Sequence, residues 1–291
     1  MQPSSLELWF TEKEFDFKNV GLTLRVKRQI HSEETPFQRL DIFETFHYGK
    51  MMTLDGIIQL TEVDEHFYHE QLVHVPLFMH PDPKRVLVVG GGDGGTAREV
   101  LRHPGVEQCE MAEIDEKVIL AARQWFPTLA VAFEDKRLTV HVADAIKFIA
   151  DARPGTYDAI LVDSSDPVGP AVGLFRKDFY ENCKKALKPQ GLLVCQTGSF
   201  WYQPNESKNA CLLLREVFGA KQSTIYWGYV PTYPSASMAY TIAAQGIDLF
   251  DFDKVRKPEG KSFETLKHYT AANHRGHFCL PKVIADGIGQ P

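Results

Sequence analysis

The chain has 291 residues, of which 44% are hydrophobic and 24% charged, which excludes a disordered polypeptide, a collagen-like fibre and a small disulfide scaffold. Its 32 Lys and Arg residues against 38 Asp and Glu residues give a net charge of −6, so we expect no broad basic surface for nucleic acid or anionic lipid. No apolar run approaches the roughly 18 residues of a membrane helix, and the first ten residues lack the pattern of a secretion signal. These features predict a cytoplasmic enzyme and favour a cationic small-molecule ligand.

The cysteines and histidines show no metal-binding pattern. The five cysteines are odd in number, widely spaced and without a CxxC pair, so reduced thiols are expected. The closely spaced histidine pairs, His66 with His69 and His274 with His277, lie neither in an HExxH arrangement nor near a cysteine pair. The sequence therefore predicts no metal site.

Residues 1–71 are interpreted as an N-terminal β-strand domain. Residues 22–29, 38–45 and 51–60 are alternating or β-branched, and turn signals at Tyr48-Gly49 and Asp55-Gly56 predict hairpins in a small antiparallel sheet. A helix is predicted over residues 61–79, opened by the capping residues Thr61 and Asp64 and ended before Pro81. We expect this helix to bridge the two parts of the chain.

Residues 72–291 are interpreted as a catalytic α/β domain. From Lys84 onward, apolar runs alternate with amphipathic stretches, an order that predicts a doubly wound parallel sheet with helices on both faces. The expected strands cover residues 85–89, 108–113, 138–142, 157–162, 191–196, 224–230 and 237–243, and the expected helices include residues 96–103, 116–126 and 175–187.

The strongest local motif is the run of five glycines around Asp93, at residues 90–95, directly after the first strand of the α/β domain. Such glycines let the backbone approach a ligand closely. The loop lacks the Lys and Ser/Thr of a phosphate-binding loop, since Thr96 and Ala97 follow it. Asp93 would also repel a pyrophosphate, so phosphate ligands are disfavoured.

Acidic residues stand at the ends of the next strands. Glu113 follows the glycine loop at the distance where an acid accepts hydrogen bonds from ribose hydroxyls in nucleoside-binding folds, and Asp144 ends the strand after it. Together they outline an adenosine pocket. The alternative is that Glu113 and Asp144 only cap the helices that follow them.

The fourth strand ends at Asp163, in the segment DSSDP. In a sheet of order 3-2-1-4-5 the first and fourth strands are neighbours, so Asp93 and Asp163 should face each other across the crevice. No basic residue lies nearby in the sequence, and clustered acids require compensation by a metal or a cationic substrate. Since magnesium prefers phosphate co-ligands that the loop disfavours, we expect an amine.

These motifs resemble the polyamine aminopropyltransferases, the spermidine synthase family. The resemblance rests on GGGDGGTAREV at 90–100, EID at 113–115, DSSDPVGPA at 163–171 and PTYPS at 231–235, and it extends to residues 48–70 and to HRGHFCLP at 274–281. It implies an N-terminal β-domain, a methyltransferase-like Rossmann domain, and transfer of the aminopropyl group of decarboxylated S-adenosylmethionine to putrescine. It implies no cofactor besides this co-substrate.

The resemblance also implies roles for individual residues. The implied donor-binding set is Gln38, Gln59, His69, Asp93, Glu113, Asp144 and Ala145. The implied putrescine-binding set is Tyr68, Asp163, Asp166, Gln196 and Tyr233. Asp93 and Asp163 match the pair that grips the aminopropyl ammonium and the attacking region. For Tyr68 and Tyr233 the alternative is ordinary half-buried packing.

The expected reaction is a direct displacement in which Asp163 removes a proton from the amine, Tyr68 supports orientation and Asp93 binds the donor. One alternative is an S-adenosylmethionine-dependent amine N-methyltransferase. Asp93 disfavours it, because two like charges about 4 Å apart repel by roughly 4 kcal/mol at an effective dielectric of about 20. The other alternative is a polyamine-binding protein without turnover. The strand-rich N-terminal part predicts at least a dimer, and the resemblance implies a homodimer or homotetramer.

Overall fold

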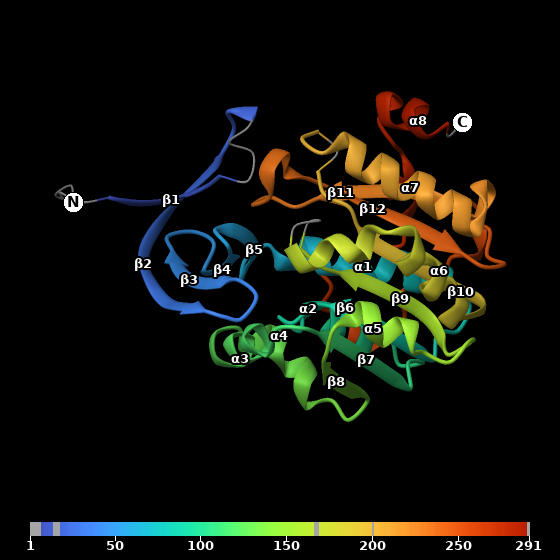
Figure 1. Ribbon diagram of the computed structural model, residues 1–291, viewed down its shortest axis with the longest axis horizontal. Coiled ribbons are helices and arrows are strands. Elements are labelled where there is room, and N and C mark those ends of the chain that lie inside the picture. The colour runs from blue at the N-terminus through green and yellow to red at the C-terminus, as the bar shows by residue number, and fades with distance from the viewer. Residues whose placement is uncertain (1–6, 14–17, 166–168, 200, 290–291) are drawn as a thin grey trace.

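Two β-sheets and the helices around the larger one make up the structure, a computed structural model that describes residues 7–13, 18–165, 169–199 and 201–289. The smaller, N-terminal sheet lies to one side of the seven-stranded sheet (Figure 1). The prediction of an antiparallel N-terminal sheet followed by a mostly parallel sheet with helices is confirmed.

The N-terminal sheet is an antiparallel meander in which each strand pairs with the next. Its strands are β1 (Leu8–Glu12), β2 (Leu22–Glu34), β3 (Arg39–Thr45), β4 (Lys50–Leu54) and β5 (Ile57–Thr61). Asp55 and Gly56 have φ of 51° and 78°, the left-handed conformation that the predicted two-residue hairpin loop requires. β2 runs past its predicted end at Gln29 because two register irregularities keep it paired with β3.

The helix α1 (Glu65–Met79) follows this sheet and is buried along nearly its whole length. Asp64 occupies the N-cap position, as predicted, and its carbonyl oxygen accepts from the Phe67 amide at 2.9 Å, but its side chain caps no helix amide. The two side-chain oxygens instead accept from Thr61 Oγ1 at 2.6 Å and from the Thr232 amide at 2.8 Å. Residue 71 lies inside α1, while the sheet ends at Thr61, so the division of the chain at residue 71 remains a proposal.

The seven-stranded sheet has the order β11-β12-β10-β9-β6-β7-β8. Its strands are β6 (Arg85–Gly90), β7 (Gln108–Glu113), β8 (Leu138–Val142), β9 (Tyr157–Asp163), β10 (Leu187–Gln196), β11 (Ser223–Tyr229) and β12 (Ser237–Ala244). All seven match predicted strands. β12 is antiparallel to both of its neighbours, and the other strand pairs are parallel, so the sheet is mostly parallel as predicted. The predicted 3-2-1-4-5 order is present as β8-β7-β6-β9-β10, with β6 beside β9.

The helices around this sheet are α2 (Gly95–Leu101), α3 (Glu116–Trp125), α4 (Pro127–Ala130), α5 (Ala145–Ala150), α6 (Lys177–Ala186), α7 (Pro204–Phe218) and α8 (Lys282–Ile288). α2, α3 and α6 correspond to predicted helices. α7 was not predicted, although Ala210, Cys211, Leu214 and Phe218 recur at helical spacing and form most of its buried face.

Two further expectations can be compared with the part of the chain that the structure describes. No helix there combines the length and apolar character needed to span a membrane. All five cysteines are free thiols, four of them buried, so the prediction of reduced cysteines is confirmed.

Candidate active site

A cavity lies where the carboxyl ends of the parallel strands face the N-terminal sheet. The larger sheet contributes the glycine loop and the ends of β6, β7, β9 and β10, and the N-terminal sheet contributes Glu12, Gln38 and Gln59. Ligands of open α/β sheets bind at this edge, where the strand order reverses. Every sequence-predicted site residue that the structure describes lines this cavity; the remaining one, Asp166, lies outside the described residues.

The glycine loop lets the ends of β6 and β9 come together. Gly90 and Gly91 have φ of 79° and 71°, and a Cβ on Gly90 would lie 2.2 Å from the carbonyl oxygen of Asp163. The amide of Gly91 donates to that same oxygen at 2.9 Å. Side chains at these two positions would force the strands apart, so the glycines bring Asp163 to the loop that carries Asp93.

One side of the cavity, which we call the strand-end wall, consists of Gly91, Gly92, Glu113, Asp144 and Ala145. Glu113 accepts from the Gly92 amide at 3.1 Å and from the Asp115 amide at 2.9 Å, which fixes its orientation. Burial outweighs these amides and raises the pKa of Glu113 to about 7. Glu113 is therefore a preoriented carboxylate whose charge changes near neutral pH.

Asp144 and Asp115 show that capping and cavity lining are separable roles. Asp144 caps α5 by accepting from the Ile146 amide at 2.9 Å, as the alternative interpretation held, and it also borders the cavity. Glu113 does not cap α3; Asp115 does, by accepting from the Lys117 amide. Asp115 also accepts from Gln38 Nε2 at 3.1 Å, which ties the N-terminal sheet to the strand-end wall.

A second group of lining residues, which we call the tyrosine wall, consists of Gln59, Tyr68, Gln196 and Tyr233. The rings of Tyr68 and Tyr233 lie 5.9 Å apart between centroids, and Tyr233 donates its hydroxyl to the Gln59 carbonyl at 2.6 Å. Gln196 donates to the Ser164 carbonyl at 2.7 Å, beside Asp163. Because both rings line the cavity, the alternative of ordinary packing does not account for their full role; they form an aromatic surface suited to a methylene chain or a cation.

Asp163 stands where the two walls meet and is held on both oxygens. Tyr68 donates its hydroxyl to Oδ1 at 2.7 Å, and Thr96 donates to Oδ2 at 2.6 Å. Burial and the nearby charge of Asp93 raise the pKa of Asp163, although both hydroxyls oppose this. A carboxylate in such surroundings is a stronger base than an exposed one.

Asp93 has a cationic partner, which corrects the expectation of an uncompensated acid pair. His69 Nε2 lies 3.4 Å from Asp93 Oδ1, and the Gly95 amide donates to the same oxygen at 2.6 Å. Burial alone would raise the pKa of Asp93, but the charge and hydrogen bond of His69 lower it. Sequence reasoning did not identify His69 as the partner of Asp93, because His69 lies on α1, far from Asp93 in the sequence.

His69, Asp93 and Asp163 have ligand-type atoms within 4.8 Å of one another. Both ring nitrogens of His69 already face carboxylates, Nδ1 at 2.7 Å from Glu65 and Nε2 toward Asp93. A ring engaged in this way offers a metal ion no lone pair, so the donor set fits an ammonium group better than a metal ion.

Sequence reasoning missed three contributors to the site. Glu12, from the outer strand β1, is buried in the cavity and accepts from the Ile58 amide at 2.7 Å. Thr96 holds Asp163, and Glu65 contacts His69. Only Thr96 carried a signal, since it directly follows the glycine loop; the other two depend on how distant elements pack.

The comparisons with known proteins agree along the whole chain. The spermine/spermidine synthase domain model matches residues 65–254, and the spermidine synthase tetramerisation domain model matches residues 8–62. A polyamine aminopropyltransferase of Bacillus mycoides (strain KBAB4) is 45% identical over 283 residues, covering 97% of this chain and 100% of that protein. The polyamine aminopropyltransferase of Bacillus subtilis (strain 168) is 42% identical over 283 residues, with coverage of 97% and 99%.

Solved structures give the same result. The crystal structure of a spermidine synthase in complex with the transition state analogue AdoDATO matches with a TM-score of 0.92 at 37% identity, covering 100% of this chain and 97% of that chain. That of the spermidine synthase from Thermotoga maritima matches with a TM-score of 0.89 at 36% identity, with coverage of 100% and 96%.

Proposed function

The chain belongs to the spermine/spermidine synthase family and is a polyamine aminopropyltransferase, and from this premise we propose how its residues divide the reaction. The reaction moves the aminopropyl group of decarboxylated S-adenosylmethionine to putrescine and yields spermidine and methylthioadenosine. The observation that supports the division most strongly is the meeting of Asp93, Asp163 and the Tyr68 hydroxyl at the junction of the two walls.

We assign the donor mainly to the strand-end wall. Glu113 receives the ribose hydroxyls and Asp144 and Ala145 border the adenine, in keeping with the family resemblance. Gln38, from the loop between β2 and β3, and Gln59, from the tyrosine wall, also contact the donor. Asp93 binds the ammonium of the aminopropyl group. An ionised carboxylate at this position favours a donor without a carboxylate of its own, and this disfavours the alternative of methyl transfer from S-adenosylmethionine.

We assign the diamine to the tyrosine wall, with its chain against Tyr68 and Tyr233 and its attacking nitrogen beside Asp163. Gln196 and Asp166 remain assigned to the diamine through the resemblance. Glu12 adds a buried carboxylate beside the tyrosine wall. It accepts a hydrogen bond from the amide of Ile58, and the next residue, Gln59, belongs to that wall. This carboxylate suits the far ammonium of the diamine.

The displacement needs a neutral amine. At pH 7, neutralising an amine of pKa about 10.4 costs roughly 4.6 kcal/mol, so a nearby base is useful. Asp163 first takes a proton from the attacking ammonium; the neutral nitrogen then attacks the methylene next to the sulfonium, and the carbon–sulfur bond breaks with its electron pair going to sulfur. Tyr68 orients Asp163, and alignment of the two substrates supplies much of the remaining rate.

We further propose that the chain assembles as a homodimer or homotetramer and acts in the cytoplasm. The proposed assembly rests on the match of residues 8–62 to a tetramerisation domain, and the proposed location rests on the free cysteines. Sedimentation at monomer mass across micromolar concentrations would contradict the assembly, and recovery outside the cytoplasmic fraction would contradict the location.

The activity is tested by supplying the purified chain with decarboxylated S-adenosylmethionine and, in separate reactions, putrescine, cadaverine, agmatine and spermidine across pH 6 to 10. We expect methylthioadenosine and spermidine in equal amounts from putrescine, with kcat/KM rising above neutral pH as the amine loses its proton. A matched reaction with S-adenosylmethionine should give no product; a methylated amine there would support the methyltransferase. A preference for spermidine would overturn the assigned acceptor.

A further inference from the structure

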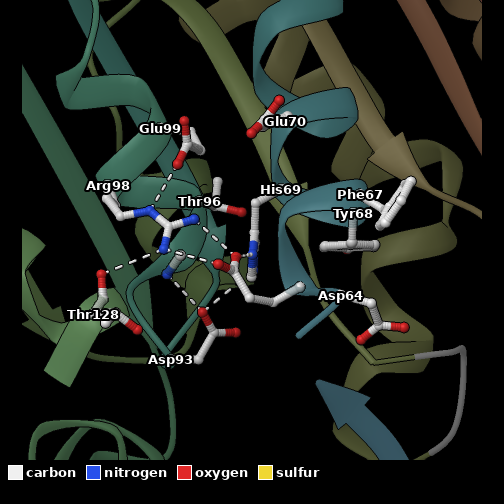
Figure 2. Close-up of polar contacts among 12 residues, drawn as sticks. Asp64, Phe67, Tyr68, His69, Glu70, Asp93, Thr96, Arg98, Glu99 and Thr128 are labelled. Carbon is white, nitrogen blue, oxygen red and sulfur yellow. Dashed lines mark hydrogen bonds and ion pairs between the residues drawn. The ribbon is translucent and has the colours of Figure 1, made fainter. Parts of the chain in front are cut away.

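Behind the cavity, a line of alternating charges leads from Asp93 into the protein. Figure 2 shows His69 with the ring of Tyr68 on one side and Asp93 and Arg98 on the other. Glu65, one turn before His69 on α1, lies between His69 and Arg98, and it contacts both. Glu65 and Arg98 do not line the cavity, so they reach the reaction only through His69.

His69 is held so that both ring nitrogens face acceptors. Nδ1 lies 2.7 Å from Glu65 Oε2, and Nε2 lies 3.4 Å from Asp93 Oδ1. An ionised carboxylate only accepts hydrogen bonds, so satisfying both partners requires the doubly protonated ring. The ring also packs against the backbone of Gly95, where a Cβ would lie 2.3 Å from His69 Cε1, so it has no room to turn away.

Glu65 is fixed in turn by Arg98. The guanidinium donates to Oε1 at 3.0 Å and to Oε2 at 2.8 Å, a two-pronged contact that matches the carboxylate shape. Arg98 also donates to Glu99 Oε1 at 2.7 Å and to the Thr128 carbonyl at 3.3 Å, so it is anchored on its other side. The side chain of Glu65 is 5% exposed, and removing Arg98 would take away one of the two cations that compensate this buried charge.

The groups that face His69 come from α1, from the loop after β6, from α2 and from the end of β9. They are Glu65, Tyr68, Asp93, Asp163 and, behind Glu65, Arg98. Burial alone would lower the pKa of His69, but the carboxylates of Asp93 and Glu65 outweigh it and raise that pKa well above its ordinary value. The same charge lowers the pKa of Asp93, whereas that of Asp163 is raised.

We propose that Glu65 and Arg98 are positioning residues for aminopropyl transfer: they hold the His69 imidazolium against Asp93 and so keep Asp93 ionised throughout the reaction, which leaves Asp163 as the carboxylate with the higher affinity for a proton. Asp163 is then the carboxylate that takes up the amine's proton. This inference rests on the proposed function. It explains how two neighbouring carboxylates acquire different tasks, because a cation placed beside only one of them separates their affinities for a proton.

The test uses Glu65→Gln, Arg98→Lys and a matched control, Glu110→Gln. Glu110 is also buried and paired with an arginine, Arg85, and it accepts from Tyr157 at 2.7 Å, but it does not line the cavity. Histidine-labelled protein is followed by NMR from pH 6 to 9, with His69→Gln identifying the His69 signal. The ratio of variant to unsubstituted kcat is measured over the same range.

We expect the His69 ring to stay protonated to a higher pH in the unsubstituted enzyme than in Glu65→Gln, because the variant lacks one of the two carboxylates that raise the pKa of His69. The kcat ratio of Glu65→Gln should then fall about tenfold or more between pH 6 and pH 9. Arg98→Lys should show a smaller fall, because lysine keeps the charge but makes a single contact. Glu110→Gln should give a ratio that does not depend on pH.

A ratio for Glu65→Gln that is constant with pH, or a His69 ring that titrates at the same pH in Glu65→Gln as in the unsubstituted enzyme, would overturn the proposal. If Glu65→Gln does not fold, the comparison of Arg98→Lys with the unsubstituted enzyme, by spectrum and by pH profile, decides the question. If the unsubstituted enzyme makes no spermidine, the proposed function fails, while the His69 spectrum still reports whether the charge arrangement exists.

Discussion

The two walls of the cavity are built in different ways. The strand-end wall takes its groups from the ends of neighbouring parallel strands, and backbone amides next to those groups, such as that of Gly92, orient them. The tyrosine wall draws Tyr68 from α1, Tyr233 from the segment between β11 and β12, and Gln59 from the N-terminal sheet. The first wall therefore follows from the sheet topology, whereas the second depends on packing between distant segments.

The largest effect is expected at Asp163, where the walls meet. Asp163→Asn should lower kcat by about 10²- to 10⁴-fold, the range for loss of a general base, because an amide takes up no proton at neutral pH. The affinity for methylthioadenosine, measured by calorimetry, should change little, because the strand-end wall is intact. Retention of kcat within about threefold, with an unchanged melting temperature, would show that water or another group takes the proton.

A smaller effect is expected at Tyr68, which tests whether the tyrosine wall acts through Asp163. Tyr68→Phe removes the 2.7 Å hydrogen bond to Oδ1 and should lower kcat about tenfold, since a hydrogen bond to a charged group contributes about 1.5 kcal/mol. In the double variant with Asp163→Asn the two losses should not add. Fully additive losses would mean that Tyr68 works independently of Asp163.

The pH dependence of methylthioadenosine binding tests the strand-end wall. Burial raises the pKa of Glu113 to about 7, so in the empty site this carboxyl is mostly protonated at pH 6 and ionised at pH 8. Ribose hydroxyls donate to the ionised form, so methylthioadenosine should bind more tightly as pH rises, by up to about tenfold over this range. Calorimetric titration at both pH values measures this. Glu113→Gln should bind more weakly with no such dependence, and an unsubstituted enzyme whose affinity is the same at both pH values would contradict the assignment.

The smallest effect is expected at Tyr233. Tyr233→Phe removes the hydroxyl that donates to the Gln59 carbonyl and keeps the aromatic face, so the free energy of unfolding should fall by about 1 kcal/mol. The KM for putrescine should rise a few-fold with kcat nearly unchanged. A loss in kcat as large as that of Tyr68→Phe would place Tyr233 in contact with the reacting atoms.

The comparison of walls also explains what the sequence could predict. Glu113, Asp144 and Asp163 each end an apolar run or follow it directly, and strand order alone brings such ends together, so their place at one edge was predictable. The hairpin loop at Asp55-Gly56 was predictable for a similar reason, because its conformation is set by the two residues themselves.

Groups that meet through packing were not predictable in the same way. The His69 partner of Asp93 and the Arg98 partner of Glu65 arise because α1 lies against α2, and neither helix carries a local signal of this contact. Glu12 lies on β1, a short outer strand of the N-terminal sheet, and the sequence of this strand does not distinguish Glu12 from the exposed acid of an ordinary edge strand. Tyr68 and Tyr233 were identified by family resemblance, since their spacing alone fits ordinary core packing equally well.

The helix α1 has a consequence for how this chain can vary. At its start, Asp64 receives the amide of Thr232; farther along, Tyr68 and His69 face the cavity, Glu70 accepts three amides from residues 267–269, and Gln71 donates to the carbonyl of Tyr229. One inserted residue would turn every later side chain by about 100° and break these links together. Descendants of this sequence can therefore change α1 by substitution, while gains and losses of length are confined to the surface loops.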